Sequence, residues 1–322
     1  MEFKHAFHVF IDNFFSTYKI LVYRLIVLAI TVGLGCAIVI PTINNLSNTV
    51  QFANLQTAFS DFWADVIALN ADKLHDGLRN VISAVNEFTH LISDKSGLVA
   101  LACCLLAVVF FLAKFLTGVG NYVAGALVND RMVMHANSSF TFTLFKNIKK
   151  SLLYAIIYAA ITFVYDILCL LIIWAIIMVG LKSLPITLIK IFLIAVLLIV
   201  FSTVKFAFIT DWLPALIQSK MNNRKALRYA FSRKGKKSAN VFSNILVIKI
   251  LIIAINVAAG IFTLGAGLLV SVPASYLLLS CFSFVNYFDA NKFKYFVDEY
   301  TVVGPKKETP VTKEEFFRGE EQ

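Results

Sequence analysis

Long apolar runs with few charges constrain this chain more than any other feature of its sequence. A helix that crosses a bilayer needs about 20 consecutive, mostly apolar residues. Runs of this kind cover residues 20–40, 98–117, 152–181, 186–208 and 241–287. The apolar fraction is 59%, which is more than one soluble core can enclose, since soluble domains hold about 45–50%. We therefore expect an all-α membrane protein.

Breaks within and between these runs predict the number of spanning helices. Pro41 ends the first run, and residues 184–185 (Leu-Pro) separate the third from the fourth. The last run is too long for one helix, and Gly260, Gly265 and Gly267 predict a tight turn within it. The third run is longer than a bilayer requires, so we expect it to tilt or to begin in the interface. Six transmembrane helices follow, arranged as a polytopic bundle of three hairpins.

Basic residues indicate the orientation of the chain. If the N-terminus is cytoplasmic, the inner segments are the one before the first span, the loops after the second and fourth spans, and the tail. They hold 3, 4, 8 and 6 Lys and Arg residues, whereas the outer loops together hold 4. The positive-inside rule then predicts a multi-pass cell-membrane protein with both termini in the cytoplasm. These short loops also account for the net charge of +10, so we expect no nucleic acid partner.

The predicted domains follow from the runs and the orientation. Residues 1–19 form an amphipathic cytoplasmic lead helix, and residues 20–288 form the six-helix membrane domain. Residues 289–322 form a cytoplasmic tail that we expect to be partly disordered, because it is polar and is interrupted by Gly304, Pro305 and Pro310.

The outer loop, residues 42–96, carries two apolar stripes with helical spacing. The first is Phe52, Leu55, Phe59, Phe62, Val66 and Leu69, and the second is Leu74, Leu78, Val81, Val85, Phe88 and Ile92. Each stripe lies on one face of a helix, which predicts an extracytoplasmic helical hairpin. Two interpretations stay open, because the stripes either pack on each other or dock a membrane protein partner or the outer leaflet. The candidate partner seam is Phe52, Phe59, Phe62, Val81 and Phe88.

Three short aromatic segments precede the first, third and fifth predicted spans. They cover residues 3–10, 140–145 and 226–231, and each continues through a polar or basic break into a span. This pattern is typical of amphipathic helices on the cytoplasmic surface, where bases meet anionic lipid. Candidate anionic-lipid contacts are Arg224, Lys225, Arg228, Arg233, Lys234, Lys236 and Lys237. Alternatively, this basic run only sets the orientation.

The third of these segments carries a resemblance to a known family. Residues 226–231 read Ala-Leu-Arg-Tyr-Ala-Phe and are followed by bases and a span. This stretch, clearest over residues 225–242, resembles uncharacterised six-span bacterial membrane proteins related to the membrane domain of some glycerophosphodiester phosphodiesterases. The resemblance implies six spans in a bacterial plasma membrane. It carries no catalytic residues, and the long outer loop departs from the compact members of the family.

Asp166 is the acidic residue placed deepest in a predicted span. It lies on a polar face that also holds Tyr154, Tyr158, Thr162, Tyr165 and Cys169. Lipid penalises such a face, so we expect it to point into the bundle.

Depth estimates select partners for Asp166. Asn256, about 15 residues into the fifth span, matches its depth best, and Lys249 lies about eight residues in, so we expect one of these two to contact it. Lys114 and Lys205 lie near the inner ends of their runs, and we expect both to extend to the interface. The resulting contact is either a structural bond between helices or part of a proton or cation path.

Three classes of function remain. The sequence contains no nucleophile–base pattern, phosphate loop or set of metal ligands, so we predict no catalytic, cofactor-binding or metal site and no enzyme. We predict a non-enzymatic scaffold or partner subunit in an envelope or export complex. The alternatives are a small-molecule or ion transporter built around the polar face of Asp166, and a lipid-handling protein.

Overall fold

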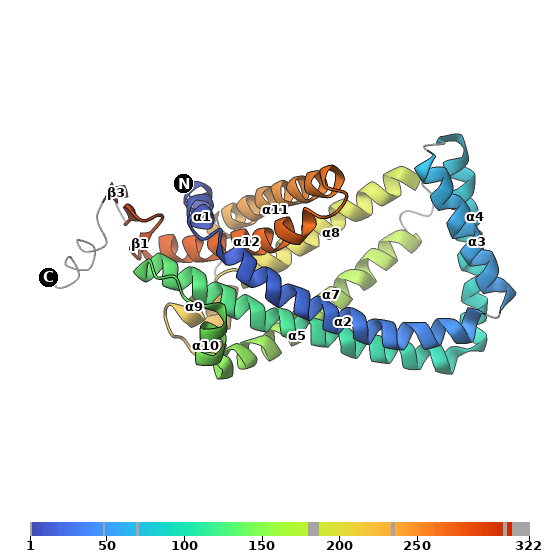
Figure 1. The fold of residues 1–322 in the computed structure, drawn as a ribbon, viewed down its shortest axis with the longest axis horizontal. Helices are drawn as coiled ribbons and strands as arrows, with labels where there is room; N and C mark the ends of the chain where they lie inside the picture. Colours follow the sequence, from blue (N-terminus) through green and yellow to red (C-terminus); the bar gives the residue numbers. More distant parts are fainter. Residues whose placement is uncertain are drawn as a thin grey trace. The chain divides into compact units, whose positions relative to one another are not determined.

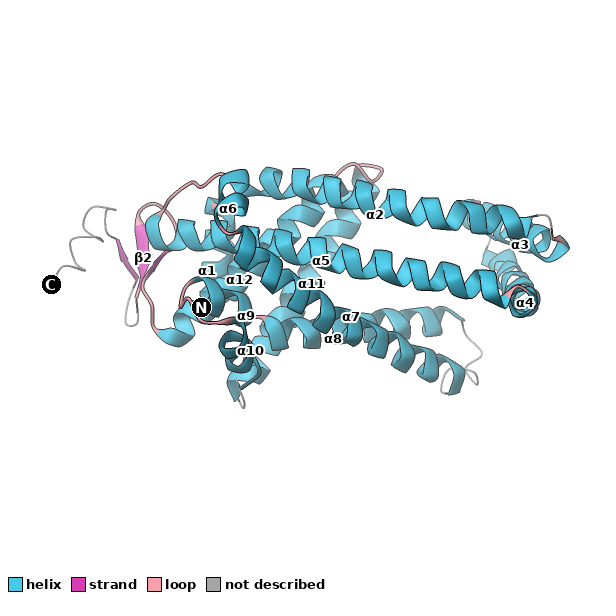
Figure 2. Ribbon diagram, turned by 90° about the horizontal axis from the view of Figure 1, so that it is seen from below, coloured by secondary structure: helices cyan, strands magenta, loops and turns pink. Residues whose placement is uncertain are grey.

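The described part of the chain is all-α apart from three short strands near its C-terminal end (Figures 1 and 2). The computed structural model describes residues 2–47, 49–68, 71–179, 187–232, 236–304 and 308–310. Within these residues, six helices are long and apolar enough to cross a membrane, as the sequence predicts, and the chain is a multi-pass membrane protein. They are α2 (Ser16–Ser47), α5 (Ser96–Met134), α7 (Ile148–Val179), α8 (Thr187–Ile209), α11 (Lys236–Phe262) and α12 (Leu268–Asn291).

Shorter elements precede, connect or follow these six helices. The helices are α1 (Glu2–Asp12), α3 (Val50–Ile67), α4 (Ala71–Asp94), α6 (Phe140–Lys146), α9 (Trp212–Ile217) and α10 (Asn223–Ser232). The strands are β1 (Tyr295–Phe296), β2 (Thr301–Val303) and β3 (Glu308–Pro310), which form one antiparallel sheet in that order. The chain divides into two compact units, of which the first joins Met1–Val27 to Lys114–Gln322 and the second is Leu28–Ala113.

Two spanning helices are longer than their apolar runs predict. The expectation that Pro41 ends the first helix is wrong, because α2 continues to Ser47. Proline has no N–H, so the Ala37 carbonyl loses its helical partner, but proline is nevertheless found within spanning helices. Close to it, the Thr42 hydroxyl donates to the Ile38 carbonyl at 2.8 Å, and the Asn45 amide donates to the Pro41 carbonyl at 3.0 Å.

The part of α5 after residue 117 carries glycines where it packs on other helices of the first unit. A Cβ atom at Gly118 would lie 2.9 Å from the Ala155 Cα atom on α7. A Cβ atom at Gly120 would lie 2.5 Å from the Tyr23 ring on α2. Small residues let helices approach closely in a membrane, so these glycines determine where α2 and α7 pack.

The core of the first unit is aromatic and is concentrated at one end of its helices. Phe282, Phe284 and Phe288 on α12 are fully buried, as is Trp212 at the start of α9. The Trp212 ring lies 4.6 Å from the ring of Tyr154 on α7. These contacts anchor α7, α9 and α12 to one another.

The first strand belongs to this core. Tyr295 is fully buried, and its hydroxyl donates to Asp289 at 2.8 Å and lies 3.2 Å from His5 Nδ1 on α1. Within the tail that the sequence predicts to be partly disordered, residues 295–303 are folded against the helices. Residues 311–322 lie outside the described part of the chain.

Helices form at all three predicted lead segments, as α1, α6 and α10, and they lie at the same end of the first unit (Figure 2). On α10, Ala226 and Ala230 are buried, while three of the candidate lipid contacts, Arg224, Lys225 and Arg228, are exposed. The side chains of the other four candidates, Arg233, Lys234, Lys236 and Lys237, lie outside the described residues.

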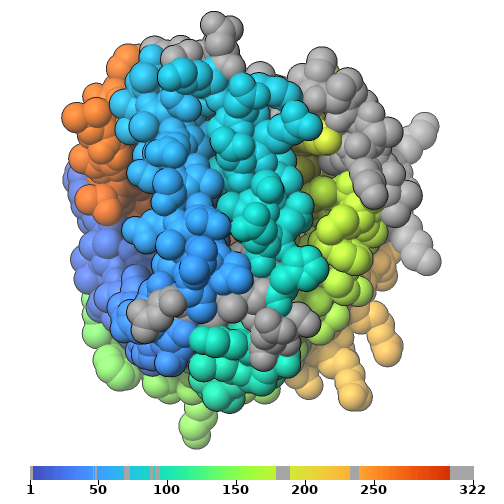
Figure 3. All heavy atoms as spheres, turned by 90° about the vertical axis from the view of Figure 1, so that its right-hand side faces the viewer, coloured from blue at the N-terminus to red at the C-terminus, as the bar shows by residue number. Residues whose placement is uncertain are grey.

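In the second unit, α3 and α4 lie side by side (Figure 3). Gly77 on α4 packs on α3, where a Cβ atom would lie 3.4 Å from the Phe62 ring. Val81 is buried, Phe52 and Phe62 are half-buried, and Phe59 is exposed. The predicted seam is therefore split between two faces of α3. The side chain of Phe88 lies outside the described residues.

Candidate functional site

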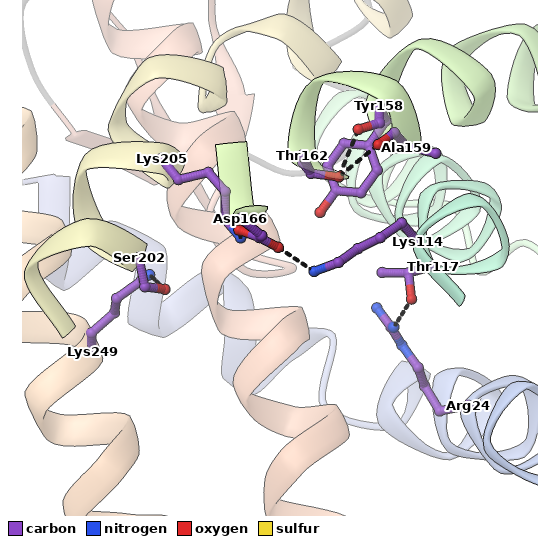
Figure 4. A network of polar contacts seen from close by, with 10 residues as sticks. All are labelled: Arg24, Lys114, Thr117, Tyr158, Ala159, Thr162, Asp166, Ser202, Lys205 and Lys249. Carbon is purple, nitrogen blue, oxygen red and sulfur yellow. Dashed lines mark hydrogen bonds and ion pairs between the residues drawn. The ribbon is translucent and has the colours of Figure 1, made fainter. Parts of the chain in front are cut away.

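Asp166 on α7 is held between two lysines from different helices (Figure 4). Its Oδ2 atom lies 2.5 Å from Lys114 Nζ on α5, and its Oδ1 atom lies 2.7 Å from Lys205 Nζ on α8. The side chain of Asp166 is 19% exposed and each lysine side chain is 22% exposed. One carboxylate thus joins three spanning helices.

The expected partners of Asp166 are wrong. Lys249 donates to the Ser202 hydroxyl on α8, and the Asn256 amide donates to the Ser275 hydroxyl on α12 at 3.3 Å. Depth counted from the ends of the apolar runs misplaced Lys114, because α5 continues to Met134 and puts this lysine near its middle. Lys205 likewise turns toward the carboxylate rather than toward the interface.

Lys249 brings a further cation to the same face of α8. Its partner Ser202 lies three residues before Lys205, and residues three apart are neighbours on a helix. Lys249 Nζ also lies 5.9 Å from the centre of the Phe206 ring, and Lys205 Nζ lies 5.9 Å from the centre of the Tyr165 ring. Rings at this distance attract a cation.

Arg24 on α2 extends the cluster to the remaining helices. Its guanidinium donates to Thr117 at 3.2 Å and to Asn121 at 2.8 Å, both on α5. It also lies 3.9 Å from the centre of the Tyr276 ring on α12, a cation–π contact. Asn121 hydrogen-bonds Tyr158 of α7. Each of the six spanning helices therefore contributes a side chain to this polar cluster.

Two residues of the predicted polar face have local roles. The Thr162 hydroxyl donates to the Tyr158 carbonyl at 2.7 Å, so it is satisfied by its own helix. The Tyr165 hydroxyl donates to the Phe201 carbonyl at 2.8 Å and fastens α7 to α8. Neither hydroxyl binds Asp166, and the predicted face is thus divided between the cluster and the helix packing.

The polar cluster carries more positive than negative charge. Its charged members are Arg24, Lys114, Asp166, Lys205 and Lys249. By sequence, α2, α7, α8 and α11 contain no acidic residue other than Asp166, and α5 and α12 each contain one close to the C-terminal end. Four cations therefore stand against one carboxylate, an excess of three positive charges.

A second charged group lies at the C-terminal end of α5. The Arg131 guanidinium binds both carboxylate oxygens of Asp12, at 2.6 and 3.0 Å. His135 Nε2 lies 3.3 Å from Asp12 Oδ2. Burial, followed by the charge of Arg131, lowers the pKa of His135 despite the nearby carboxylate. This group joins α1 to α5, and it contains no excess of charge that would suggest a ligand.

No protein family, curated protein or solved structure matches this chain. The resemblance of residues 225–242 to six-span bacterial proteins therefore stays a prediction. The function has to be argued from the residues of the polar cluster and from the exposed surfaces.

Proposed function

We propose that this protein binds a small anionic solute within the membrane, as a transporter does, and that the polar cluster is the binding site. The excess of positive charge in the cluster is the observation that supports this. A charged side chain inside a bilayer is costly unless a counter-charge or water accompanies it. Asp166 neutralises one charge, so an anion of one to three charges would complete the balance.

The same observation argues against the proton or cation path. Asp166 already accepts from Lys114 and Lys205, so a cation would have to displace an ammonium group from it. Four positive side chains would also repel a cation as it approached. Asp166 is instead a positioning residue that holds the two lysines in place.

Lys249 and Arg24 are the groups we assign to ligand contact. An ammonium group has three N–H donors, and the Ser202 hydroxyl accepts one from Lys249. The partners of Arg24 are neutral side chains and an aromatic ring. An anion would give both cations the counter-charge that the carboxylate of Asp166 gives to the other two.

Anion flux into vesicles tests the proposal. The wild-type protein, reconstituted in phosphatidylcholine vesicles, should conduct chloride or inorganic phosphate above the rate of empty vesicles. Lys249→Met should reduce that flux at least about tenfold, the effect of losing a charge-assisted contact of about 1.4 kcal/mol or more. Lys190→Met, on α8 but outside the cluster, is the matched control. Equal flux in both variants would contradict the proposal.

We also propose that both termini are cytoplasmic and that the six helices form three hairpins in the plasma membrane. The distribution of Lys and Arg supports this orientation. The contact between His5 on α1 and Tyr295 on β1 supports an even number of crossings, because it joins the two ends of the chain. The α3–α4 pair would then be extracytoplasmic. In intact cells, Asp76→Cys should react with a membrane-impermeant thiol reagent, and labelling only after membrane disruption would reverse the orientation.

A scaffold role is the second candidate, and a separate observation favours it. Phe59, Trp63 and Ile67 form a ridge along α3 at four-residue spacing and are 56%, 59% and 72% exposed. Contiguous apolar surface of this kind marks an interaction site. We propose a membrane protein partner of an envelope or export complex as its occupant.

Purification in mild detergent followed by native mass spectrometry separates the two candidates. A stoichiometric protein partner that is lost on deletion of residues 52–92 but retained in Lys249→Met would support the scaffold. A particle without protein partners, together with anion flux that depends on Lys249, would support the transporter.

A further inference from the structure

A groove opens between the start of α2 and helix α6, apart from the polar cluster. It encloses about 510 Å³. Lys19 and Asn137 line one end, and Val22, Ile26, Phe140 and Leu144 line the rest. All of these residues belong to the first unit. The lining thus combines a cation and polar groups with several apolar side chains.

Two hydrogen bonds hold the ammonium group of Lys19 in place at the groove. Lys19 Nζ donates to the Asn137 side chain at 3.2 Å and to the Ser138 carbonyl at 2.9 Å. Both partners are neutral, and the described residues place no carboxylate on this ammonium group. One of its three N–H donors is left for an acceptor in the groove. Ser139 and Thr141 also line the groove.

The apolar part follows a membrane-spanning helix. Val22 and Ile26 lie about one and two turns after Lys19, and they are 59% and 54% exposed. The ring of Phe140 lies 5.4 Å from the ring of Tyr23 and closes the α6 side. Since α2 begins at Ser16, Lys19 lies in the first turn of the span, and Ile26 lies about 10 Å further along its axis.

We propose that this groove binds one anionic phospholipid, with its phosphate on the Lys19 ammonium and an acyl chain along Val22 and Ile26. A cation at the end of a span followed by an apolar wall matches the order of groups in a phospholipid. A water-soluble anion would use the cation but would leave the apolar wall uncovered. The bilayer is therefore the source of the ligand, whichever leaflet it occupies, and the inference does not depend on the proposed transport function.

Lipid retention by the full-length protein tests the assignment. The protein is incorporated into nanodiscs of equal parts phosphatidylglycerol and phosphatidylcholine, released, and analysed by native mass spectrometry. The wild type should retain one phosphatidylglycerol in preference to phosphatidylcholine. Lys19→Met should reduce that preference about fivefold, the effect of about 1 kcal/mol for one basic residue at an anionic surface. Lys146→Met, an exposed cation on α6 outside the groove, should leave it unchanged.

A second variant keeps the assignment falsifiable if Lys19→Met disturbs the loop that Lys19 holds. Val22→Trp leaves the cation in place and fills the apolar part, so it should also expel the lipid, while Lys19→Arg should retain it. Unchanged retention in Val22→Trp, or displacement of the lipid by millimolar inorganic phosphate, would overturn the assignment. Equal losses in Lys146→Met and Lys19→Met would overturn it as well, because they would indicate diffuse surface charge.

Discussion

Helices α12 and α3, one from each compact unit of this chain, differ in how far they bury their large apolar side chains. On α12, in the first unit, Phe282, Phe284 and Phe288 are fully buried. In the second unit, α3 buries none of its described side chains completely, and Trp63 and Ile67 are exposed. Exposed apolar residues on spanning helices face lipid, but α3 is not among the candidate spans. The difference indicates that α3 needs a covering surface, whereas neighbouring helices of the first unit cover α12.

The largest expected effect contrasts one residue from each unit. Phe284→Ala should lower the free energy of unfolding by about 3–5 kcal/mol, because it empties a fully buried site. Trp63→Ala should change it by less than about 0.5 kcal/mol, because that side chain is largely exposed. Thermal unfolding in detergent, followed by circular dichroism, measures both. Similar losses would mean that α3 is packed as tightly as α12.

The next effect concerns the ion pairs of the polar cluster. Asp166→Asn should cost about 2–3 kcal/mol, because it leaves two ammonium groups without their counter-charge. This is below the 3–5 kcal/mol typical of a fully buried pair, since the three side chains are about one-fifth exposed. The double variant Asp166→Asn with Lys205→Met should recover part of the loss. A double variant less stable than Asp166→Asn alone would contradict the charge argument.

Glycine substitutions in the two units should change the free energy of unfolding by smaller amounts and with opposite signs. Gly118→Ala in the first unit should cost about 1–3 kcal/mol, because the added methyl group meets the backbone of Ala155. Gly33→Ala in the second unit has nothing within 4 Å, so it should stabilise α2 by up to about 1 kcal/mol. Melting temperatures of the two variants should therefore move in opposite directions. A shift of the same sign would show that the close approach of α5 to α7 is not maintained.

The smallest expected effect is a pH dependence at the end of α5. The pKa of His135 is lowered in the folded protein, so its neutral form is favoured there. Stability is therefore complete above the ordinary histidine pKa of about 6.5 and falls as the pH drops through the folded value. His135→Gln should flatten this part of the stability profile. A profile that is equally steep in the variant would assign the effect to another group.

The spanning helices could be predicted from the sequence because lipid acts on each segment separately. An apolar run of about 20 residues is a local property, and all six spans were found from it. The three lead helices were also found, because their aromatic and basic patterns are local. The ends of α2 and α5 were not, since a proline such as Pro41 can either end a spanning helix or lie within it, and the small residues after 117 pack against other helices.

The candidate site shows the same division more sharply. Asp166 stands out in the sequence because a lone carboxylate in a bilayer requires compensation. Which cations provide it depends on the relative heights of α5, α7 and α8, and these follow from non-local contacts such as Gly118 against Ala155. A shift of one helical turn, about 5.4 Å, exchanges one partner for another. Sequence alone therefore determined that the chain spans the membrane and must neutralise Asp166, and only the tertiary structure decided that Lys114 and Lys205 do so.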